Sequence, residues 1–341
     1  WVEFFKTGPH REPLYPFLTS VSMCLGDSLG VSYKSVQAFF QILMLAAIQW
    51  LTYNILRRLK IHHGIVALTV FYLGISPALL NSALSLYSEV LACLLVTVIL
   101  FAVIRSWRLI FRETRYGRIF WSGVLLGLLG VTMTLVKGIF EYAFFVLLLP
   151  FLYVFLKGIL IRQKRLLLAS LLLVITTLVF FQIPIFSYKS LNKKYNGKFA
   201  LADRGAGLLY GNAARRTEAL ATDKIVAALA RIPGEGIARG ILPQEDYDYW
   251  SYQAIEYVGV VKTHELTAQG IPREEIDSGL ISHAFQAIIK NPFQYVFFMA
   301  VEGSKMFFWE STQIGYVGCP AWLKRLYEFA YFKNALRLLV S

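Results

Sequence analysis

The chain has 341 residues, of which 57% are hydrophobic and only 16% are charged, and its formal net charge is +13 at pH 7. Soluble globular domains usually carry about a quarter charged residues, so this composition excludes an ordinary soluble protein and predicts an all-α integral membrane protein. The three cysteines, Cys24, Cys93 and Cys319, are too few and too widely spaced for a disulfide framework or a Cys-x-x-Cys metal site.

The beginning of the chain has no signal-peptide pattern, because Glu3, Lys6 and Glu12 lie among its first eighteen residues. We expect the sequence to start partway through a longer protein, with residues 1–35 forming the end of an outer loop and an entry segment. The stretch from Glu328 to the end is too short for a complete span, so we expect the carboxyl end to be cut as well.

Seven further apolar stretches meet or approach the roughly 20 residues that a helix needs to cross the hydrocarbon core of a bilayer. They are residues 36–56, 65–80, 87–104, 119–135, 140–156, 166–186 and 292–308. We predict a helical bundle of about seven to eight spans, with six spans in residues 36–186 and incomplete membrane helices in residues 292–341. Pro77 predicts a bend at the end of the second span.

The alternate connections between these spans hold twelve Lys or Arg residues against the single acid Glu113. The basic residues are Arg57, Arg58, Lys60, Arg105, Arg108, Arg112, Arg115, Arg118, Lys157, Arg162, Lys164 and Arg165. The positive-inside rule places these connections in the cytoplasm. The net charge is therefore a topology signal, and we predict no nucleic-acid partner.

Residues 187–291 then lie on the outer side, and their pattern predicts a helical extracytoplasmic module. Helical stripes of apolar residues cover 217–232 and 249–269, and Pro272 begins another helix that continues to Asn291. Amphipathic helices of this kind lie along a membrane surface or pack on one another. Either arrangement predicts a lid above the bundle.

Several residues at the outer ends of the spans are candidates for a functional site. Glu89 begins the third span, where a carboxylate is costly unless it is paired, hydrated or functional. Lys137 and Glu141 are four residues apart at an outer turn, where they form either a helix-surface ion pair or a site in which Lys137 binds a lipid-linked phosphate. Arg11 lies in a proline-rich bend and is a candidate ligand for a phosphate or a carboxylate.

A glycine-rich stretch at residues 203–212 fits neither the GxGxxG pattern nor the GK[ST] pattern of phosphate-binding loops. We predict a glycine-rich turn beside the membrane, with Arg204, Tyr210 and Asn212 free to face a ligand. Three acids lie close together in a predicted turn: Glu245, Asp246 and Asp248. A solvated surface is favoured over a Ca²⁺ or Mg²⁺ site there, because such sites need six or more oxygen ligands. A divalent metal remains an option, with no metal ligand assigned.

Five short motifs follow one another in a familiar order. They are Arg-x-Pro-x-Tyr-Pro at residues 11–16, Ser-Glu at 88–89, TLVKG ending at 138, NGKFALADRGAGLLYGN at 196–212 and AFQAIIKNPFQYV at 284–296. Together they resemble the GT-C glycosyltransferases, and within that fold the family 39-like protein mannosyltransferase and aminoarabinose transferase group of bacterial membrane enzymes. The likeness covers roughly residues 11–310, and the order of the motifs carries it.

The resemblance implies inverting transfer of a sugar from a polyprenyl-phosphate donor to a lipid, glycan or protein acceptor. It also implies a multi-pass protein of the bacterial cytoplasmic (inner) membrane. Its motifs nominate substrate-binding residues: Arg11, Tyr15, Glu89, Lys137, Arg204, Tyr210 and Asn212. The family's catalytic acidic loop is expected upstream of Trp1, which leaves Glu89 as the catalytic candidate within this sequence.

Two other classes of function remain open. A transporter or flippase of lipid-linked glycans would also be a multispan protein, although the sequence has no internal repeat and its spans carry their ionisable residues at the outer ends. A polysaccharide polymerase or ligase would likewise use a lipid-linked sugar and a large outer loop.

Overall fold

The computed structural model describes residues 12–75, 77–84, 87–112, 115–197, 199–202, 205–232, 238 and 240–308. Within these ranges every regular element is a helix, which confirms the predicted all-α class. The chain divides between Ala202 and Asp203 into two compact units, here called unit 1 and unit 2. Arg11, Arg204, Cys319 and the partial span predicted from Glu328 lie outside the described residues.

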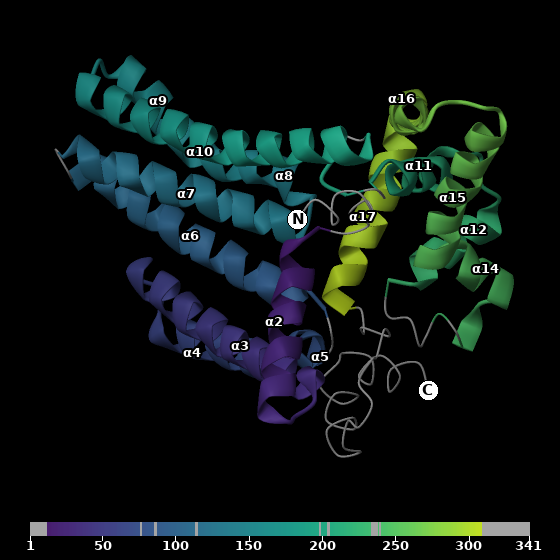
Figure 1. The fold of residues 1–341 in the computed structure, drawn as a ribbon, viewed down its shortest axis with the longest axis horizontal. Helices are drawn as coiled ribbons and strands as arrows, with labels where there is room; N and C mark the ends of the chain where they lie inside the picture. Colours follow the sequence, from purple (N-terminus) through teal and green to yellow (C-terminus); the bar gives the residue numbers. More distant parts are fainter. Residues whose placement is uncertain are drawn as a thin grey trace. The chain divides into compact units, whose positions relative to one another are not determined.

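The described part of unit 1 contains ten helical elements, drawn in Figure 1. They are α2 (Leu14–Leu29), α3 (Tyr33–Arg58), α4 (His63–Ile75), α5 (Pro77–Leu84), α6 (Glu89–Arg112), α7 (Tyr116–Val136), α8 (Phe140–Ala143), the 3₁₀ helix η1 (Phe144–Leu148), α9 (Leu149–Leu160) and α10 (Lys164–Asn196). Among the described residues, five helices are long and apolar enough to cross a membrane: α3, α6, α7, the continuous α8 to α9, and α10. A membrane protein is thus supported, with five candidate spans where the sequence predicts seven to eight.

The three basic connections lie together at one end of unit 1, here called the basic end. Arg108 near the end of α6 donates a hydrogen bond to the carbonyl of Arg58 at the end of α3, and Arg165 at the start of α10 donates to the carbonyl of Phe111. Figure 1 shows the turns after α3, α6 and α9 at the left-hand end of this unit. The predicted clustering of these connections on one side of the bundle therefore exists in the fold.

The pair α4 and α5 returns the chain from the basic end to the other end of unit 1. α3 ends at the basic end, whereas α6 begins at the far end, so the residues between them must travel the length of the bundle. The second predicted span is divided, because α4 ends at Ile75 and Pro77 is the first residue of α5. Proline is well tolerated in the first turn of a helix, where its missing N–H needs no partner.

Glycines allow α7 and α10 to approach closely. A Cβ atom added at Gly127 would lie 2.7 Å from the carbonyl oxygen of Thr177, and one at Gly123 would lie 2.9 Å from the Cβ of Thr176. Small residues at such contacts let helices in a membrane bring their backbones together. Beside this contact, the rings of Phe144 and Phe181 stack with centroids 4.4 Å apart.

Helix α2 runs across the far end of the bundle (Figure 1). Pro13 precedes its first residue, and Gly30, with φ of 64°, adopts the left-handed conformation that ends it. The buried hydroxyl of Ser22 donates to Gln37 Oε1 at 2.6 Å and fixes α2 to the start of α3.

Unit 2 contains six described helices longer than a single turn. They are α11 (Gly205–Thr217), α12 (Thr222–Ala230), α14 (Gln244–Tyr249), α15 (Tyr252–Ala268), α16 (Arg273–Lys290) and α17 (Pro292–Phe308). The predicted helices at 249–269 and after Pro272 are confirmed as α15 and α16, whereas the helix predicted over 217–232 is shortened to α12. The stretch at 292–308 forms α17, in which Phe298 contacts the buried Trp250 at a centroid distance of 4.8 Å.

The prediction of a glycine-rich turn is wrong for residues 205–212, because Gly205 is the first residue of helix α11. The glycines serve helix packing instead. A Cβ atom at Gly211 would lie 2.2 Å from the carbonyl oxygen of Ile255, and one at Gly259 would lie 2.1 Å from that of Gly207. Close contact between α11 and α15 offsets the poor helix propensity of glycine.

Candidate functional site

Glu89 and Lys137 form an ion pair at the end of unit 1 opposite the basic end. Glu89 is the first residue of α6, and Lys137 follows the last residue of α7 with an extended backbone. The Lys137 Nζ lies 2.7 Å from Glu89 Oε1, with 35% and 47% of the two side chains exposed. Both groups are accessible, so the pair can exchange partners with a ligand.

Glu141 pairs with Lys189, which corrects the alternative in which Lys137 and Glu141 form an ion pair on one helix. Lys189 Nζ lies 2.5 Å from Glu141 Oε1, and these side chains are only 15% and 16% exposed. The helical pairing fails because α7 ends at Val136, so Lys137 and Glu141 do not lie on the same helix. Lys189 is available because α10 continues to Asn196, ten residues past the predicted end of that span.

Glu12 completes this group of charges. The backbone N–H of Gly138 donates to Glu12 Oε1 at 2.8 Å, which holds the carboxylate against the turn between α7 and α8. We call Glu12, Glu89, Lys137, Glu141 and Lys189 the acidic-end cluster. Its three carboxylates and two ammonium groups come from segments far apart in the sequence and meet at one end of the bundle.

Tyr15 lies beside this cluster on α2. Its phenolic oxygen accepts a hydrogen bond of 2.9 Å from Gln41 Nε2 and a longer one, 3.5 Å, from Gln37 Nε2. Burial raises the pKa of Tyr15 to about 12, and the negative charge of Glu89 adds to the increase. The phenol is therefore neutral at physiological pH and keeps its proton as a hydrogen-bond donor.

Tyr210 and Asn212 lie on α11 in unit 2. Tyr210 packs against a buried apolar cluster that includes Leu280. Asn212 donates to the carbonyl of Leu208 at 2.7 Å and accepts from Arg216 at 2.5 Å, so both of its polar atoms bond within α11. This contradicts the expectation that Asn212 is free to face a ligand.

Arg216 explains why Asn212 has a structural role. Its side chain is only 6% exposed, and its Nη2 lies 4.0 Å from Glu302 Oε1 on α17. Burial lowers the pKa of Arg216, with the charge of Glu302 acting in the opposite direction. Asn212 thus helps to satisfy a buried guanidinium that links two helices of unit 2.

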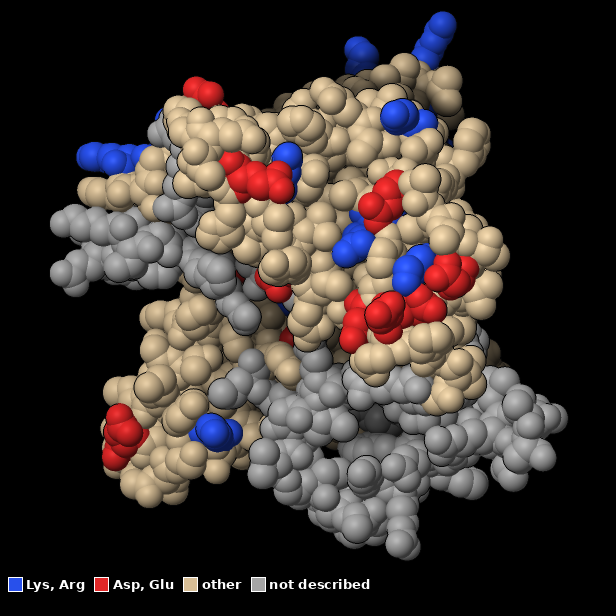
Figure 2. Space-filling model, turned by 90° about the vertical axis from the view of Figure 1, so that its right-hand side faces the viewer, with Lys and Arg blue, Asp and Glu red and all other residues tan. Residues whose placement is uncertain are grey.

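The three neighbouring acids of unit 2 have protein partners or face solvent. Asp246 pairs with Lys224, and Asp248 accepts from Gln244 at 2.9 Å, while Glu245 is exposed. Figure 2 shows acidic and basic side chains close together on the side of the molecule that it presents. Within the described part of the chain, no group of three or more His, Cys, Asp or Glu is arranged to hold a metal ion.

The sequence interpretation named two of the five cluster residues, Glu89 and Lys137, as binding candidates, and missed Glu12 and Lys189. The sequence does contain a local signal for Lys189, because this basic residue comes three positions after Phe186, where the apolar stretch of the predicted span ends. Pairing it with Glu141, 48 residues earlier, requires the tertiary structure.

Comparisons of the chain with family models, with curated proteins and with solved structures gave no match.

Proposed function

We propose that this protein transfers a sugar from a polyprenyl-phosphate donor to an acceptor at the outer face of a bacterial cytoplasmic membrane. The observation that supports this function is the exposed pair of Glu89 and Lys137 at the end of the bundle opposite the basic connections. A carboxylate and an ammonium group at the membrane surface supply a base for a hydroxyl and a counter-charge for a lipid phosphate.

In the proposed step, Lys137 exchanges Glu89 for the phosphate of the lipid-linked donor. The released Glu89 carboxylate removes the proton of the acceptor hydroxyl. At the same time the hydroxyl oxygen attacks the anomeric carbon of the sugar from the face opposite the phosphate. The bond between that carbon and the phosphate oxygen breaks, and the polyprenyl phosphate leaves with the electron pair. This displacement inverts the anomeric centre, and Lys137 stabilises the charge that develops on the leaving group.

The neighbouring groups position this pair in the proposal. Glu12 holds the turn that carries Lys137, since it binds the N–H of Gly138. The ion pair of Glu141 and Lys189 fixes α8 to α10. Tyr15 offers a neutral hydroxyl to a sugar oxygen, because the pKa of its phenol is about 12.

We also propose on which side of the membrane each end of the bundle lies. The positive-inside rule would place the basic end in the cytoplasm. The acidic-end cluster and residues 187–291 would then lie on the extracytoplasmic side, where nucleotide sugars are absent and lipid-linked sugars are the available donors. α4 with α5 would form a further, broken span beyond the five long helices.

The experiment is a transfer assay with the protein reconstituted in liposomes containing a polyprenyl-phosphate sugar with a radioactive label. Glu89→Gln should reduce transfer by about 10²-fold or more, in the range for loss of a general base. Lys137→Ala should reduce it by at least about tenfold, as expected when one phosphate-stabilising charge is lost. Lys262→Ala and Glu265→Gln remove an exposed ion pair of unit 2 and serve as controls.

Wild-type transfer by both Glu89→Gln and Lys137→Ala would contradict the proposed site. Movement of intact lipid-linked glycan across the bilayer, without transfer to an acceptor, would instead identify a flippase. Retained helicity and elution volume establish that each variant is folded.

A further inference from the structure

Unit 2 has an exposed apolar face on the second half of α16 and the first half of α17. Six large apolar side chains belong to it, and they are between 39% and 89% exposed. They are Ile281, Phe285 and Ile289 on α16, and Phe293, Val296 and Phe297 on α17. We call these six residues the α16–α17 face. Only Asn291 separates the two helices, so Ile289 and Phe293 flank their junction.

Helical periodicity places the members of the face on one side of each helix. On α16 they follow the spacing i, i+4, i+8, and on α17 the spacing i, i+3, i+4. Other apolar residues of the same helices pack inside unit 2: Leu280 and Ala284 on α16, and Phe298 and Val301 on α17, are all buried. Each helix therefore has one apolar side within unit 2 and a second apolar side at the surface.

The face lies in a stretch of the chain that is almost free of charge. The 24 residues from Ser278 to Val301 include one Lys or Arg, which is Lys290, and no Asp or Glu. The beginning of α16 differs, because it holds Glu275 and Asp277, and α15 carries the ion pair of Lys262 and Glu265. A contiguous exposed apolar patch marks a surface that meets a membrane or another protein.

Two observations favour a membrane over a protein partner. Interfaces between proteins are on the whole about as apolar as the rest of a protein surface, whereas the α16–α17 face is made only of apolar side chains. Eight residues lie between the end of α10, a candidate membrane span, and the start of α11. A connection of this length reaches about 30 Å at most.

The packing of unit 2 links this short connection to the face. Tyr210 on α11 packs against a buried cluster that includes Leu280 of α16. The first helix after the span therefore holds the helix that presents Ile281, Phe285 and Ile289. Unit 2 is joined to the membrane by its connection to α10, and its uncharged face belongs to the same compact unit.

We propose that the α16–α17 face docks unit 2 on the lipid bilayer, in the leaflet at which α10 ends. The six apolar side chains enter the boundary between headgroups and acyl chains, as an interfacial helix does. Lys290, at the end of α16, lies at the level of the lipid phosphates. The docking does not depend on sugar transfer, since no residue of the face belongs to the acidic-end cluster.

The test is spin labelling of the whole protein in liposomes of phosphatidylethanolamine and phosphatidylglycerol, in a variant with its three cysteines replaced by serine. Collision of the nitroxide with oxygen, which dissolves in hydrocarbon, and with a water-soluble nickel chelate measures its depth. Labels on Ile289→Cys and Phe293→Cys should lie about 5–10 Å into the boundary between headgroups and acyl chains. These side chains are 74% and 89% exposed, so replacing them removes few contacts within unit 2.

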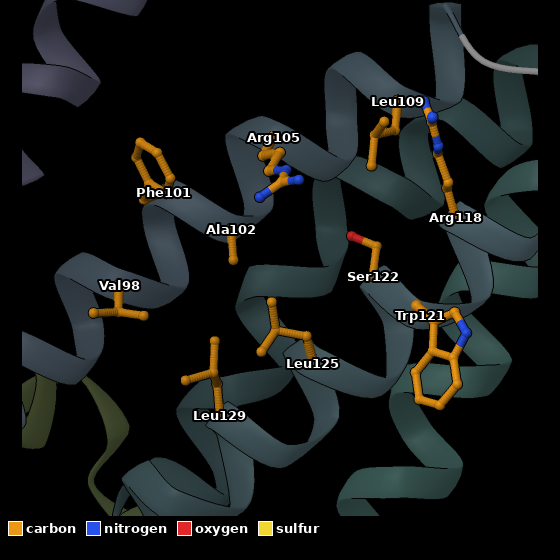
Figure 3. Close-up of a pocket in the computed structure, with 10 residues that line it drawn as sticks. All are labelled: Val98, Phe101, Ala102, Arg105, Leu109, Arg118, Trp121, Ser122, Leu125 and Leu129. Atoms are coloured by element: carbon orange, nitrogen blue, oxygen red, sulfur yellow. The ribbon is translucent and has the colours of Figure 1, made fainter.

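Two reference positions calibrate the depth. Glu275→Cys, at the charged beginning of the same helix, should report water. Leu125→Cys should report hydrocarbon, because Leu125 lies near the middle of the candidate span α7. Leu125 lines a cavity of about 500 Å³ between α6 and α7, shown in Figure 3, which leaves space for the nitroxide.

A second measurement asks whether the apolar character of the face holds unit 2 on the lipid. Ile289→Glu with Phe293→Glu should move a label on Phe297→Cys from the lipid to water. His264→Glu with Gln269→Glu adds the same charge at exposed positions on or next to α15, and should leave that label at its original depth. Retained helicity by circular dichroism establishes that each variant is folded.

Each other result would overturn the proposal. Equal access of the nickel chelate to labels at Ile289, Phe293 and Glu275 would place the face in water. Low access of both oxygen and the nickel chelate at Ile289 and Phe293 would mean that protein covers the face. In that case, magnetic coupling between labels in the single-cysteine variant Phe293→Cys would identify a second copy of the chain as the cover.

Discussion

The ion pair of Lys189 and Glu141 gives a test at the scale of single residues. Both side chains are about five-sixths buried, so removing one charge leaves the other without its partner in a region of low dielectric. Lys189→Met should lower the free energy of unfolding by about 2 kcal/mol or more. Thermal unfolding in detergent, followed by circular dichroism, measures this change.

The matched control is Lys262, which pairs with Glu265 on an exposed surface. Lys262→Met should change stability by no more than about 0.5 kcal/mol, as for most exposed ion pairs. The double variant Glu141→Gln with Lys189→Met should recover much of the loss, because it leaves no unpaired charge. Equal effects of Lys189→Met and Lys262→Met would show that burial of the first pair is not important.

The phenol of Tyr249 leads us to expect that the folded state loses stability at alkaline pH. Burial, reinforced by its hydrogen bond to Glu218, raises the pKa of this phenol from 10.0 to about 12. A raised pKa means that the folded state favours the neutral phenol, so its contribution to stability is complete below about pH 10 and is lost as the pH rises toward 12. Glu218→Gln should move the pKa back toward 10.

Absorbance at 295 nm during alkaline titration, taken as the difference between the wild type and Tyr249→Phe, reports this ionisation. A midpoint near pH 10 in the wild type, unaffected by Glu218→Gln, would disprove the assigned environment.

The sequence could locate single charges at the ends of helices, but it could not pair them. Glu89 was predicted to begin a span, and it is the first residue of α6. Its partner Lys137 lies 48 residues later, and the pair forms only when α6 and α7 pack side by side. Glu12 reaches the N–H of Gly138 across 126 residues, a contact for which local patterns contain no information.

At the scale of helices, contact between α11 and α15 depends on glycine. Gly259→Ala should destabilise unit 2 by about 2 kcal/mol or more, because its Cβ atom would overlap the backbone of Gly207 and separate the helices. Gly279→Ala on α16 is the control, since a Cβ atom there meets nothing within 4 Å. This control should stabilise the helix by up to about 1 kcal/mol, the usual gain of alanine over glycine.

Unfolding in denaturant measures both changes, and a stabilising Gly259→Ala would contradict the close packing.

The same contact explains why the glycine-rich stretch was predicted as a turn. Glycine has a low intrinsic helix propensity. At Gly207 and Gly211 the packing of α11 against α15 outweighs this propensity, and the stretch is helical. By contrast, α15 and α16 were predicted well because apolar periodicity and Pro272 are local signals.

At the scale of the whole molecule, the composition predicted a membrane protein, and five described helices are long and apolar enough to cross a membrane where hydropathy predicted seven to eight spans. α4 has 13 residues and α17 has 17, both shorter than the roughly 20 residues of a typical span. α17 packs Phe298 and Val301 against Trp250, so part of its apolar surface serves unit 2. An apolar stretch that faces protein and one that faces lipid have the same composition, and the sequence alone does not separate them.

The path of α4 and α5 leads to a prediction about topology. Arg58 and Arg108 meet at the basic end, so the ends of α3 and α6 must lie on one side of the membrane, and the chain has to cross between them. In a variant with its three cysteines replaced by serine, His62→Cys and Gln163→Cys should react with a membrane-impermeant maleimide only after the cells are permeabilised. Ser88→Cys and Gln269→Cys should react in intact cells.

The comparison of His62→Cys with Ser88→Cys decides the role of the broken helix. Labelling of both from the same side would mean that α4 and α5 enter the membrane and return, which would place Glu89 beside Arg58. That arrangement conflicts with the ion pair between Glu89 and Lys137, because Lys137 follows α7, which leaves the basic end. Reaction of Ser88→Cys in intact cells, and of His62→Cys only after permeabilisation, would make α4 with α5 a sixth crossing and place the acidic-end cluster outside, where the proposed transfer requires it.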